Sequence, residues 1–303
     1  MKNSFTKIIG LLLVLSLAAC SAPNTPQAGI KIVASTTMVG DVVSQVGGKH
    51  IQLTVLYPVG ADPHTFEPRP QDVAAIANAQ IIFLNGLELE HSLQPVIDAN
   101  ATGKVVKVSD GVDVLPFSGS EATSQSQATS DPHTWMDPNL VKVWVNNIEA
   151  ALTAQDPANA EDYAANAKSY LAQLTDLNAW IQNEVAQIPA ENRKLVTDHE
   201  NMGYFIHRYN FTLIGLVVDS LSTGASPSAQ DLAKLEDLIR QQGVKAIFIG
   251  STINPNLTDQ VASDTGTKVI TINTESLGEQ GSDTATYIQF MQKLVTTIVN
   301  GLK

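Results

Sequence analysis

Short apolar runs rich in β-branched residues alternate with stretches of helical periodicity along most of this 303-residue chain. In the first half, the apolar runs predict strands and the stretches between them predict helices. The predicted strands are residues 30–36, 51–57, 81–86 and 105–110, and the predicted helices are residues 39–47, 70–78 and 92–99. Strands that alternate with helices form parallel sheets through βαβ crossovers. The first half therefore predicts an α/β lobe around one parallel sheet.

The same alternation returns near the other end of the chain. The predicted strands there are residues 194–198, 211–218, 245–250 and 268–273, and the predicted helices are residues 202–209, 228–241, 255–265 and 283–299. A chain of this length can also hold two domains of roughly 100–200 residues each. The sequence therefore predicts an α/β protein with two Rossmann-like βαβ lobes, each built on a parallel sheet.

One long helix is predicted between the two lobes. Asp156-Pro157 is a favourable start, because a capping residue precedes a proline at the first helical position. Apolar residues then recur at gaps of three and four, which indicates one apolar stripe. The stripe consists of Tyr163, Ala167, Tyr170, Leu174, Leu177, Ile181, Val185 and Ile188. Pro189 ends this predicted helix.

The length of this helix favours a linking role. About thirty residues at 1.5 Å each reach roughly 45 Å, which is enough to cross both lobes. The predicted arrangement is an N-terminal lobe at 30–152, a linking helix at 153–190 and a C-terminal lobe at 191–303. The alternative is an ordinary surface helix that belongs to one lobe.

The first twenty residues have the features of a lipoprotein signal. Two lysines precede an apolar run at 8–15, which is too short for a spanning helix of about 20 residues and fits a secretory signal. A buried N-terminal strand or helix is the alternative. The residues Leu17-Ala18-Ala19-Cys20 resemble the lipobox of bacterial lipoproteins. That resemblance implies a signal peptide at 1–19, cleavage before Cys20, and a diacylglycerol group on the cysteine sulfur.

Cys20 is the only cysteine, so no intramolecular disulfide can form. Residues 20–29 are rich in Pro, Ser and Gly and are predicted to be a flexible tether. We therefore expect a protein outside the cytoplasm that is lipid-anchored to the cell membrane.

The net charge excludes one class of partner. The whole chain has a formal charge of −12, and loss of the two lysines in residues 1–19 would make it −14. Phosphate contacts need clustered Lys and Arg side chains. Nucleic acid is therefore not an expected partner.

Two of the six histidines lie in the same tetrapeptide, Asp-Pro-His-Thr, at residues 62–65 and 131–134. Proline fixes its own φ angle and pushes the preceding residue toward extended geometry, so it stiffens a loop. A stiff loop holds an imidazole in place and lowers the ordering cost of binding. His64 and His133 are therefore candidate ligands, and ordinary hydrogen-bonded loop histidines are the alternative.

His199 and Glu275 each follow a predicted strand of the second lobe. Ligands of α/β proteins gather outside the carboxyl ends of the strands. Three imidazoles and one carboxylate in such positions suit a divalent transition metal. The remaining histidines have simpler interpretations, namely an exposed turn for His50, a helix start for His91, and a packed or surface position for His207.

Four segments carry a resemblance to a known family. ADPHTFEPRPQDV, DPHTWMDPN, VTDHENMGYF and NTESLGEQG occur in this order. Together with the lipobox they resemble the metal-binding lipoproteins of bacterial ABC importers for zinc and manganese, the cluster A-I solute-binding proteins. The resemblance covers essentially the whole mature chain. It implies two lobes joined by a rigid helix, one metal ion in the cleft, and the ligands His64, His133, His199 and Glu275.

The third ligand of this family varies between His and Glu, and the fourth varies between Asp and Glu. Glu200 is therefore a rival of His199, although the motif places His199 in register. Many zinc-specific members also carry a His-rich acidic loop before the second ligand. Residues 117–131 contain no histidine, so this chain departs from the pattern and a metal-scavenging loop is not expected.

The sequence thus predicts a monomeric solute-binding protein that captures a divalent metal between its lobes and delivers it to an ABC-type membrane permease. Zinc is the expected ion, because imidazole suits zinc whereas carboxylate and water oxygens suit manganese. A manganese or iron importer, or a surface adhesin with a metal site, is the alternative. An enzyme is not expected, because four protein ligands would close the position that a catalytic zinc keeps open for water. The HExxH and GxSxG motifs are also missing from the sequence.

Overall fold

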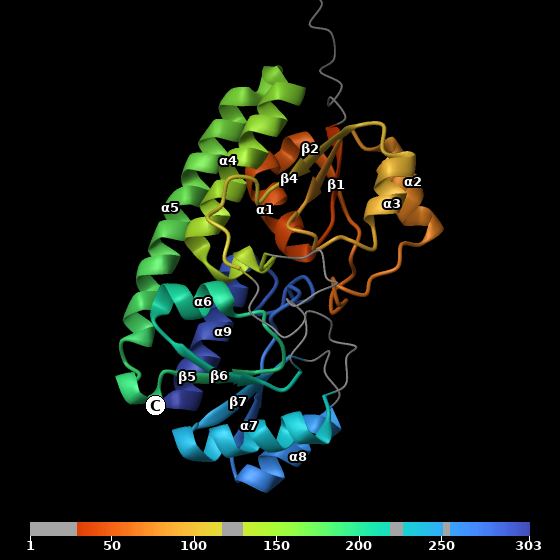
Figure 1. The fold of residues 1–303 in the computed structure, drawn as a ribbon. Coiled ribbons are helices and arrows are strands. Elements are labelled where there is room, and N and C mark those ends of the chain that lie inside the picture. Colours follow the sequence, from red (N-terminus) through yellow and green to blue (C-terminus); the bar gives the residue numbers. More distant parts are fainter. Residues whose placement is uncertain (1–28, 117–129, 219–226, 251–254) are drawn as a thin grey trace, which may run out of the picture.

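The computed structural model describes residues 29–116, 130–218, 227–250 and 255–303 (Figure 1). The predicted signal peptide, the predicted lipid site at Cys20 and the tether up to residue 28 lie outside these residues, as does most of the loop at 117–131. Within the described part of the chain, no helix is both long and apolar enough to cross a membrane.

The first lobe contains a parallel sheet in the order β2-β1-β3-β4. Its elements are β1 (Ile30–Ala34), α1 (Thr37–Gly47), β2 (Ile51–Val55), α2 (Pro70–Asn78), β3 (Ile81–Leu84), α3 (Gln94–Asn100) and β4 (Lys104–Lys107). Successive side chains of a strand point to opposite faces. Ile32 of β1 accordingly packs in the core that contains α1, whereas Val33 packs with Ile76 of α2 and Ile97 of α3. Helices therefore cover both faces of this sheet.

The second lobe repeats the arrangement with the order β6-β5-β7-β8. Its elements are β5 (Lys194–Thr197), α6 (Gly203–Tyr209), β6 (Thr212–Leu216), α7 (Ala229–Gln242), β7 (Ala246–Ile249), α8 (Pro255–Thr265), β8 (Lys268–Thr271) and α9 (Tyr287–Leu302). Phe248 of β7 faces the core that contains α9, and Ile247 faces the core that contains α7. Two parallel sheets with helices on both faces confirm the predicted fold class.

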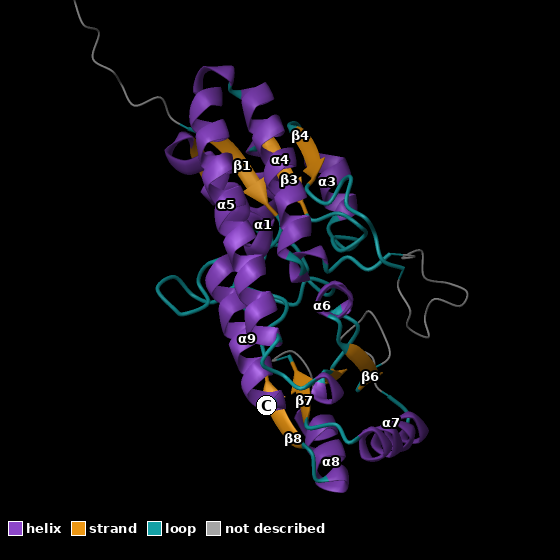
Figure 2. Cartoon of the chain, turned by 90° about the vertical axis from the view of Figure 1, so that its left-hand side faces the viewer, coloured by secondary structure: helices purple, strands orange, loops and turns teal. Residues whose placement is uncertain are grey.

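The long helix is α5 (Ala160–Val185), and it runs along both lobes (Figures 1 and 2). It contacts α1 of the first lobe and α9 of the second. The predicted apolar stripe is buried along its whole length and belongs to one core that includes residues of both lobes. The linking role is therefore confirmed, and the alternative of a surface helix of one lobe is wrong.

The predicted start of this helix is wrong by a few residues. Asp156 ends the preceding helix, and Pro157–Asn159 form a single 3-10 turn before α5 begins. The Asp156 carboxylate accepts hydrogen bonds from Asn159 Nδ2 at 2.6 Å and from the Tyr163 hydroxyl at 2.8 Å. These contacts hold the chain in a sharp turn instead of a continuous helix.

A further long helix, α4 (Pro138–Gln155), was not predicted from the sequence. It begins as a helix should, because Asp137 caps it through the Asn139 N–H and Pro138 occupies the first turn. Its buried face includes Trp144, Ile148 and Leu152. α4 packs beside α5 and also contacts α1 and β4, so it lies against the first lobe, whereas α5 runs along both lobes. The boundaries 30–152, 153–190 and 191–303 stay a prediction.

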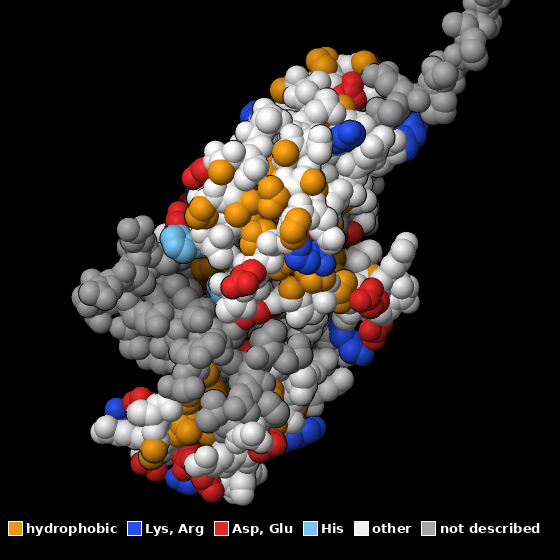
Figure 3. Space-filling view, turned by 90° about the vertical axis from the view of Figure 1, so that its right-hand side faces the viewer, with side chains coloured by type: hydrophobic (Ala, Val, Ile, Leu, Met, Phe, Trp, Pro, Cys, Tyr) orange, Lys and Arg blue, Asp and Glu red, His pale blue; other side chains and the backbone are white. Residues whose placement is uncertain are grey.

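The last helix also differs from its predicted range of 283–299. α9 begins at Tyr287, because Thr286 caps it by accepting a hydrogen bond from Gln289 N at 3.4 Å. Residues 277–286 therefore remain an irregular segment between β8 and α9. On the face drawn in Figure 3, Lys and Arg side chains are scattered over both lobes and form no basic patch, which agrees with the acidic composition.

Candidate metal-binding site

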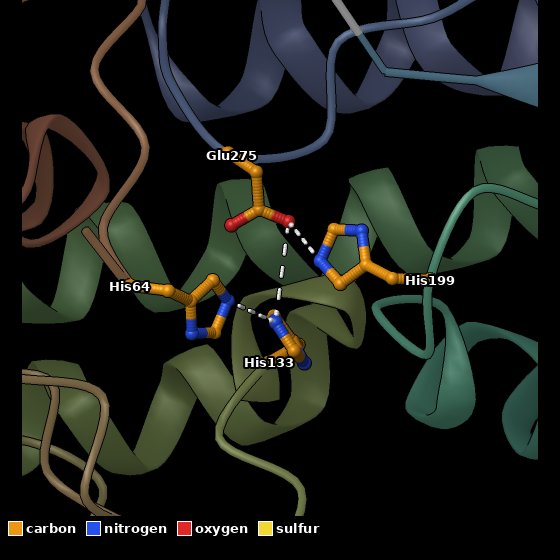
Figure 4. Close-up of side chains that lie close together, drawn as sticks. All are labelled: His64, His133, His199 and Glu275. Carbon is orange, nitrogen blue, oxygen red and sulfur yellow. Dashed lines mark hydrogen bonds and ion pairs between the residues drawn. The ribbon is translucent and has the colours of Figure 1, made fainter. Parts of the chain in front are cut away.

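Four side chains converge between the two lobes (Figure 4). His64 lies in the loop between β2 and α2, and His133 directly precedes the 3-10 helix η3 (Thr134–Met136). His199 follows β5, and Glu275 follows β8. The structure thus brings together all four residues that the sequence singled out. His133, His199 and Glu275 are buried, whereas His64 keeps part of its surface exposed.

The spacing of the four groups suits one small cation. One potential ligand atom from each residue lies within 4.8 Å of all the others. The Nε2 atoms of His64 and His133 are 3.2 Å apart, and Nε2 of His199 is 3.4 Å from Glu275 Oε1. Bonds of about 2.0–2.2 Å in tetrahedral geometry separate ligand atoms by roughly 3.3–3.6 Å. The four groups therefore surround a position that a four-coordinate ion can fill.

The two Asp-Pro-His-Thr segments form the same local turn. Asp62 Oδ1 accepts the His64 backbone N–H at 2.9 Å, and Asp131 Oδ1 accepts the His133 backbone N–H at 2.9 Å. Such a turn is a preferred conformation of Asp, because its short carboxylate reaches the backbone two residues on. The tetrapeptide therefore sets the direction in which each histidine leaves its loop.

Residues behind His133 hold its ring and its loop. Asp131 Oδ1 lies 2.7 Å from Nδ1 of the ring, which leaves Nε2 to face the centre of the site. Asn85, which follows β3, donates to the Pro132 carbonyl at 3.0 Å. Thr134 Oγ1 lies 3.0 Å from Ser109 Oγ, which follows β4. Two strand ends of the first lobe thus anchor the His133 loop.

The two groups of the second lobe are joined through Asn201. Its Nδ2 donates to Thr274 Oγ1 at 2.7 Å and to Glu275 Oε1 at 3.2 Å. Asp198 Oδ2 lies 3.4 Å from Nδ1 of His199 and also accepts the Gly250 N–H at 3.0 Å. A carboxylate behind a ligating imidazole fixes its orientation and raises its basicity. Both lobes therefore present a carboxylate-supported histidine to the cleft.

Proximity of these groups shifts their pKa values strongly. Burial, and then the neighbouring His133, lower the pKa of His64 to about 4. Burial alone would lower the pKa of His199, but Asp198 and Glu275 raise it to about 10. Burial would raise the pKa of Glu275, but His199, His133 and His64 hold it well below its usual range. A divalent cation that binds here therefore meets an ionised carboxylate and displaces the proton of His199.

Two atoms that face the site are buried without a hydrogen-bond partner among the described residues. They are His199 Nε2 and Glu275 Oε2. An unpaired buried polar atom costs roughly 1–3 kcal/mol. A cation held between the four side chains would satisfy both atoms, so the donor set fits a bound metal ion.

Buried hydrogen bonds connect the site loops across the lobe boundary. Trp135 Nε1 donates to the Thr274 carbonyl at 2.9 Å. The Tyr287 hydroxyl donates to the Trp135 carbonyl at 2.7 Å, and the Tyr204 hydroxyl donates to the Asp131 carbonyl at 2.8 Å. These contacts tie the segment around His133 to the loop that carries Glu275 and to helices α9 and α6 of the second lobe.

The other acidic and histidine candidates lie outside the cluster. Glu200 is buried but does not join the four residues, so Glu200 is not favoured as the third ligand. His91 and His207 are exposed. The prediction of an exposed turn for His50 is wrong, because its side chain is only 18% exposed and its Nε2 lies 2.6 Å from Asp162 Oδ2 of α5.

Sequence reasoning missed the residues behind the four candidate ligands. Asp131 and Asp198 each stand one or two positions before a candidate histidine, so a search for carboxylates beside the histidines could have found them. Asn201 carried no such signal, because its contact with Glu275 joins positions 74 residues apart.

Comparisons with known proteins found a matching family and a similar full-length relative. The family described as zinc-uptake complex component A, periplasmic, matches residues 32–301. A manganese-binding lipoprotein of Halalkalibacterium halodurans is 32% identical over 100% of this chain and 99% of its own length.

Two solved structures are similar over almost their whole length. The periplasmic zinc-binding protein of Treponema pallidum is 28% identical with a TM-score of 0.80, and the match covers 91% of this chain and 99% of that one. The manganese-bound periplasmic metal-binding protein of Candidatus Liberibacter asiaticus is 25% identical with a TM-score of 0.79, covering 90% and 99%. Names of zinc-binding and manganese-binding proteins thus both occur among the relatives.

Proposed function

This chain belongs to the zinc-uptake component A family of periplasmic metal-binding proteins, and from this premise we propose that the ion it carries is zinc. It is the substrate-binding component of an ABC importer, which binds a metal ion and delivers it to the membrane permease, and it is not an enzyme. Its full-length relatives are named lipoproteins, so it acts outside the cytoplasm and is anchored to the membrane by lipid.

We assign His64, His133, His199 and Glu275 as the metal ligands. The observation that carries this assignment is the convergence of three imidazoles and one carboxylate on one point between the lobes. The spacing of their nitrogen and oxygen atoms supports it, as do the two unpaired buried atoms that face this point. Two further carboxylates, Asp131 and Asp198, support the rings from behind.

The donor set supports zinc over manganese. Zinc accepts four ligands of mixed nitrogen and oxygen type, whereas manganese prefers more oxygen ligands. This site offers three nitrogen atoms and one carboxylate, which matches the ligand preference of zinc. The second candidate is manganese, which is favoured by the names of several full-length relatives.

Binding affinity alone does not separate the two candidates, because zinc binds more tightly than manganese at almost any such site. The test is therefore uptake of radioactive zinc and of manganese by a strain in which this gene is deleted, with and without the wild-type gene restored. We expect the deletion to lower zinc uptake, to impair growth under zinc chelation, and to leave manganese uptake unchanged.

Two complementing variants make the test specific to the site. His133→Ala should fail to restore zinc uptake, whereas His91→Ala, an exposed histidine outside the cluster, should restore it. Loss of manganese uptake alone would overturn zinc as the cargo and leave the importer function standing.

A further inference from the structure

His64 differs from the other proposed ligands in its surroundings. It is the one member of the cluster that keeps part of its surface exposed. It lies on residues 56–69, here called the His64 loop, which connects β2 to α2. Glu275 lies opposite on residues 272–286, here called the Glu275 loop, which connects β8 to α9. The exposed side of the site is thus bordered by one loop from each lobe.

Ser276, the neighbour of Glu275, joins these two loops. The Gly60 backbone N–H donates to Ser276 Oγ at 2.9 Å, and Ser276 is itself buried. The position of Gly60 depends on a left-handed turn, because its φ angle is +78° and glycine adopts such values without strain. Gly60 stands four positions before His64, so this bond links the backbone that carries His64 to the residue next to Glu275.

Thr37 at the start of α1 completes the contact. Ser276 Oγ donates its proton to the Leu277 carbonyl at 2.9 Å, and Leu277 N donates to Thr37 Oγ1 at 2.9 Å. The two hydroxyl oxygens lie 3.4 Å apart. A hydroxyl group has one proton and two lone pairs. Since the Ser276 proton is used, Ser276 can accept from both Gly60 and Thr37, and the network is self-consistent.

The opposite side of the site is held differently. There, Trp135 and Tyr204 make buried hydrogen bonds between the His133 segment and the second lobe. Breaking those bonds requires the separation of packed aromatic side chains, whereas the Gly60 bond ends on an exposed loop backbone. The side bordered by the His64 loop is therefore the easier one to open.

We propose that Ser276 is a positioning residue that latches the His64 loop to the Glu275 loop and thereby limits the rate at which the metal leaves. This inference rests on the proposed function, because it assumes that the four residues bind the metal. In this mechanism, the Gly60–Ser276 bond breaks, His64 moves away with its loop, and the ion leaves past the position of His64. His133, His199 and Glu275 remain in place during this step.

The test is the release rate of zinc from the full-length protein after rapid mixing with an excess of a strong chelator. Ser276→Ala should release zinc about two- to tenfold faster, the factor expected from the loss of one hydrogen bond. The association rate should stay within error of wild type. The visible spectrum of the cobalt(II) form should also be unchanged, because that spectrum reports the ligands and their geometry.

Control variants separate a latch from local support of the Glu275 loop. Ser282→Ala removes a hydroxyl from the same loop whose hydrogen bonds stay within it, and it should leave release unchanged. Thr37→Val should accelerate release like Ser276→Ala, whereas Thr37→Ser keeps the hydroxyl and should restore the wild-type rate.

Unchanged release in Ser276→Ala would overturn the latch, and so would an altered cobalt spectrum in that variant. Failure of the wild-type protein to bind a metal ion would instead contradict the proposed function. The two hypotheses therefore fail by different measurements.

Discussion

The two Asp-Pro-His-Thr segments have identical sequences and share a contact between the Asp side chain and the His backbone N–H, yet their surroundings in the fold differ. At residues 131–134 the histidine is fully buried and its ring contacts Asp131 at 2.7 Å. At residues 62–65 the histidine lies on a partly exposed loop, and its Asp62 accepts from the backbone N–H. The tetrapeptide thus encodes the contact between Asp and the His backbone, and the packing around it separates a buried, anchored candidate ligand from a partly exposed one.

The largest expected effect is the loss of the anchored ligand. His133→Ala should weaken zinc binding by more than about 100-fold, since removal of a group merely behind a ligand already costs about 10–100-fold. His64→Ala should weaken it less, because water can enter at the exposed position and replace the imidazole. The measurement is competition with a chromophoric chelator, with His91→Ala as the control. Equal losses in both variants would contradict the distinction between the two segments.

The aspartates of the two segments should also differ. Asp131→Ala removes both the turn contact and the support of the His133 ring, so zinc affinity should fall about 10–100-fold. Asp62→Ala removes the contact with the His64 backbone N–H, and we expect a smaller loss of zinc affinity. The same chelator competition measures both. A larger loss from Asp62→Ala would show that the buried carboxylate does not support its ring as inferred.

The pH dependence of binding tests the protonation states. The pKa of His199 is raised to about 10, so at pH 8 this imidazole carries a proton that zinc must displace. The pKa of His64 is lowered to about 4, so His64 is already neutral and releases none. Affinity should therefore rise about tenfold per pH unit near pH 8, with one proton released per ion. Calorimetry in buffers of different ionisation enthalpy counts the protons, and release of two would contradict the inference that only His199 is protonated.

The last comparison concerns the threonines of the two segments and the stability of the fold. Thr134 is fully buried, and its hydroxyl lies 3.0 Å from Ser109 Oγ, to which Trp144 Nε1 also donates at 3.0 Å. Thr134→Val should lower the free energy of unfolding by about 1–3 kcal/mol, because Ser109 loses a buried partner. Thr65 is exposed, so Thr65→Val should change the free energy of unfolding by less than about 0.5 kcal/mol. Urea unfolding in the presence of a chelator measures both, and a similar loss in the two variants would contradict the comparison.

The elements of the fold were largely predictable from local patterns. The strands and most helices follow from periodicity, and the buried stripe of α5 was predicted residue by residue. The start of α5 and the presence of α4 were mispredicted because two Asp-Pro pairs offer similar signals for the start of a helix. Asp137-Pro138 and Asp156-Pro157 both look like helix starts, but only the first opens a long helix. At Asp156-Pro157, Tyr163 and Asn159 donate hydrogen bonds to the Asp156 carboxylate, and these bonds stabilise a turn instead of a continuous helix.

The sequence by itself determined the chemistry of the site. The types of the four side chains, their order along the chain and the turn that presents two of them are all properties of short segments. The expectation that nucleic acid is not a partner likewise rests on charge and composition alone, because an acidic chain with few Lys and Arg residues offers few groups to neutralise phosphates.

Only the tertiary structure decided which of these side chains meet and which of them stays partly exposed. His64 and Glu275 are 211 positions apart, and they meet because the loops after the strands of both sheets converge on one boundary between the lobes. The contacts that set this boundary, such as Trp135 with Thr274 and Gly60 with Ser276, join residues more than a hundred positions apart. No local pattern encodes such a contact, because its formation depends on the packing of both lobes against α5.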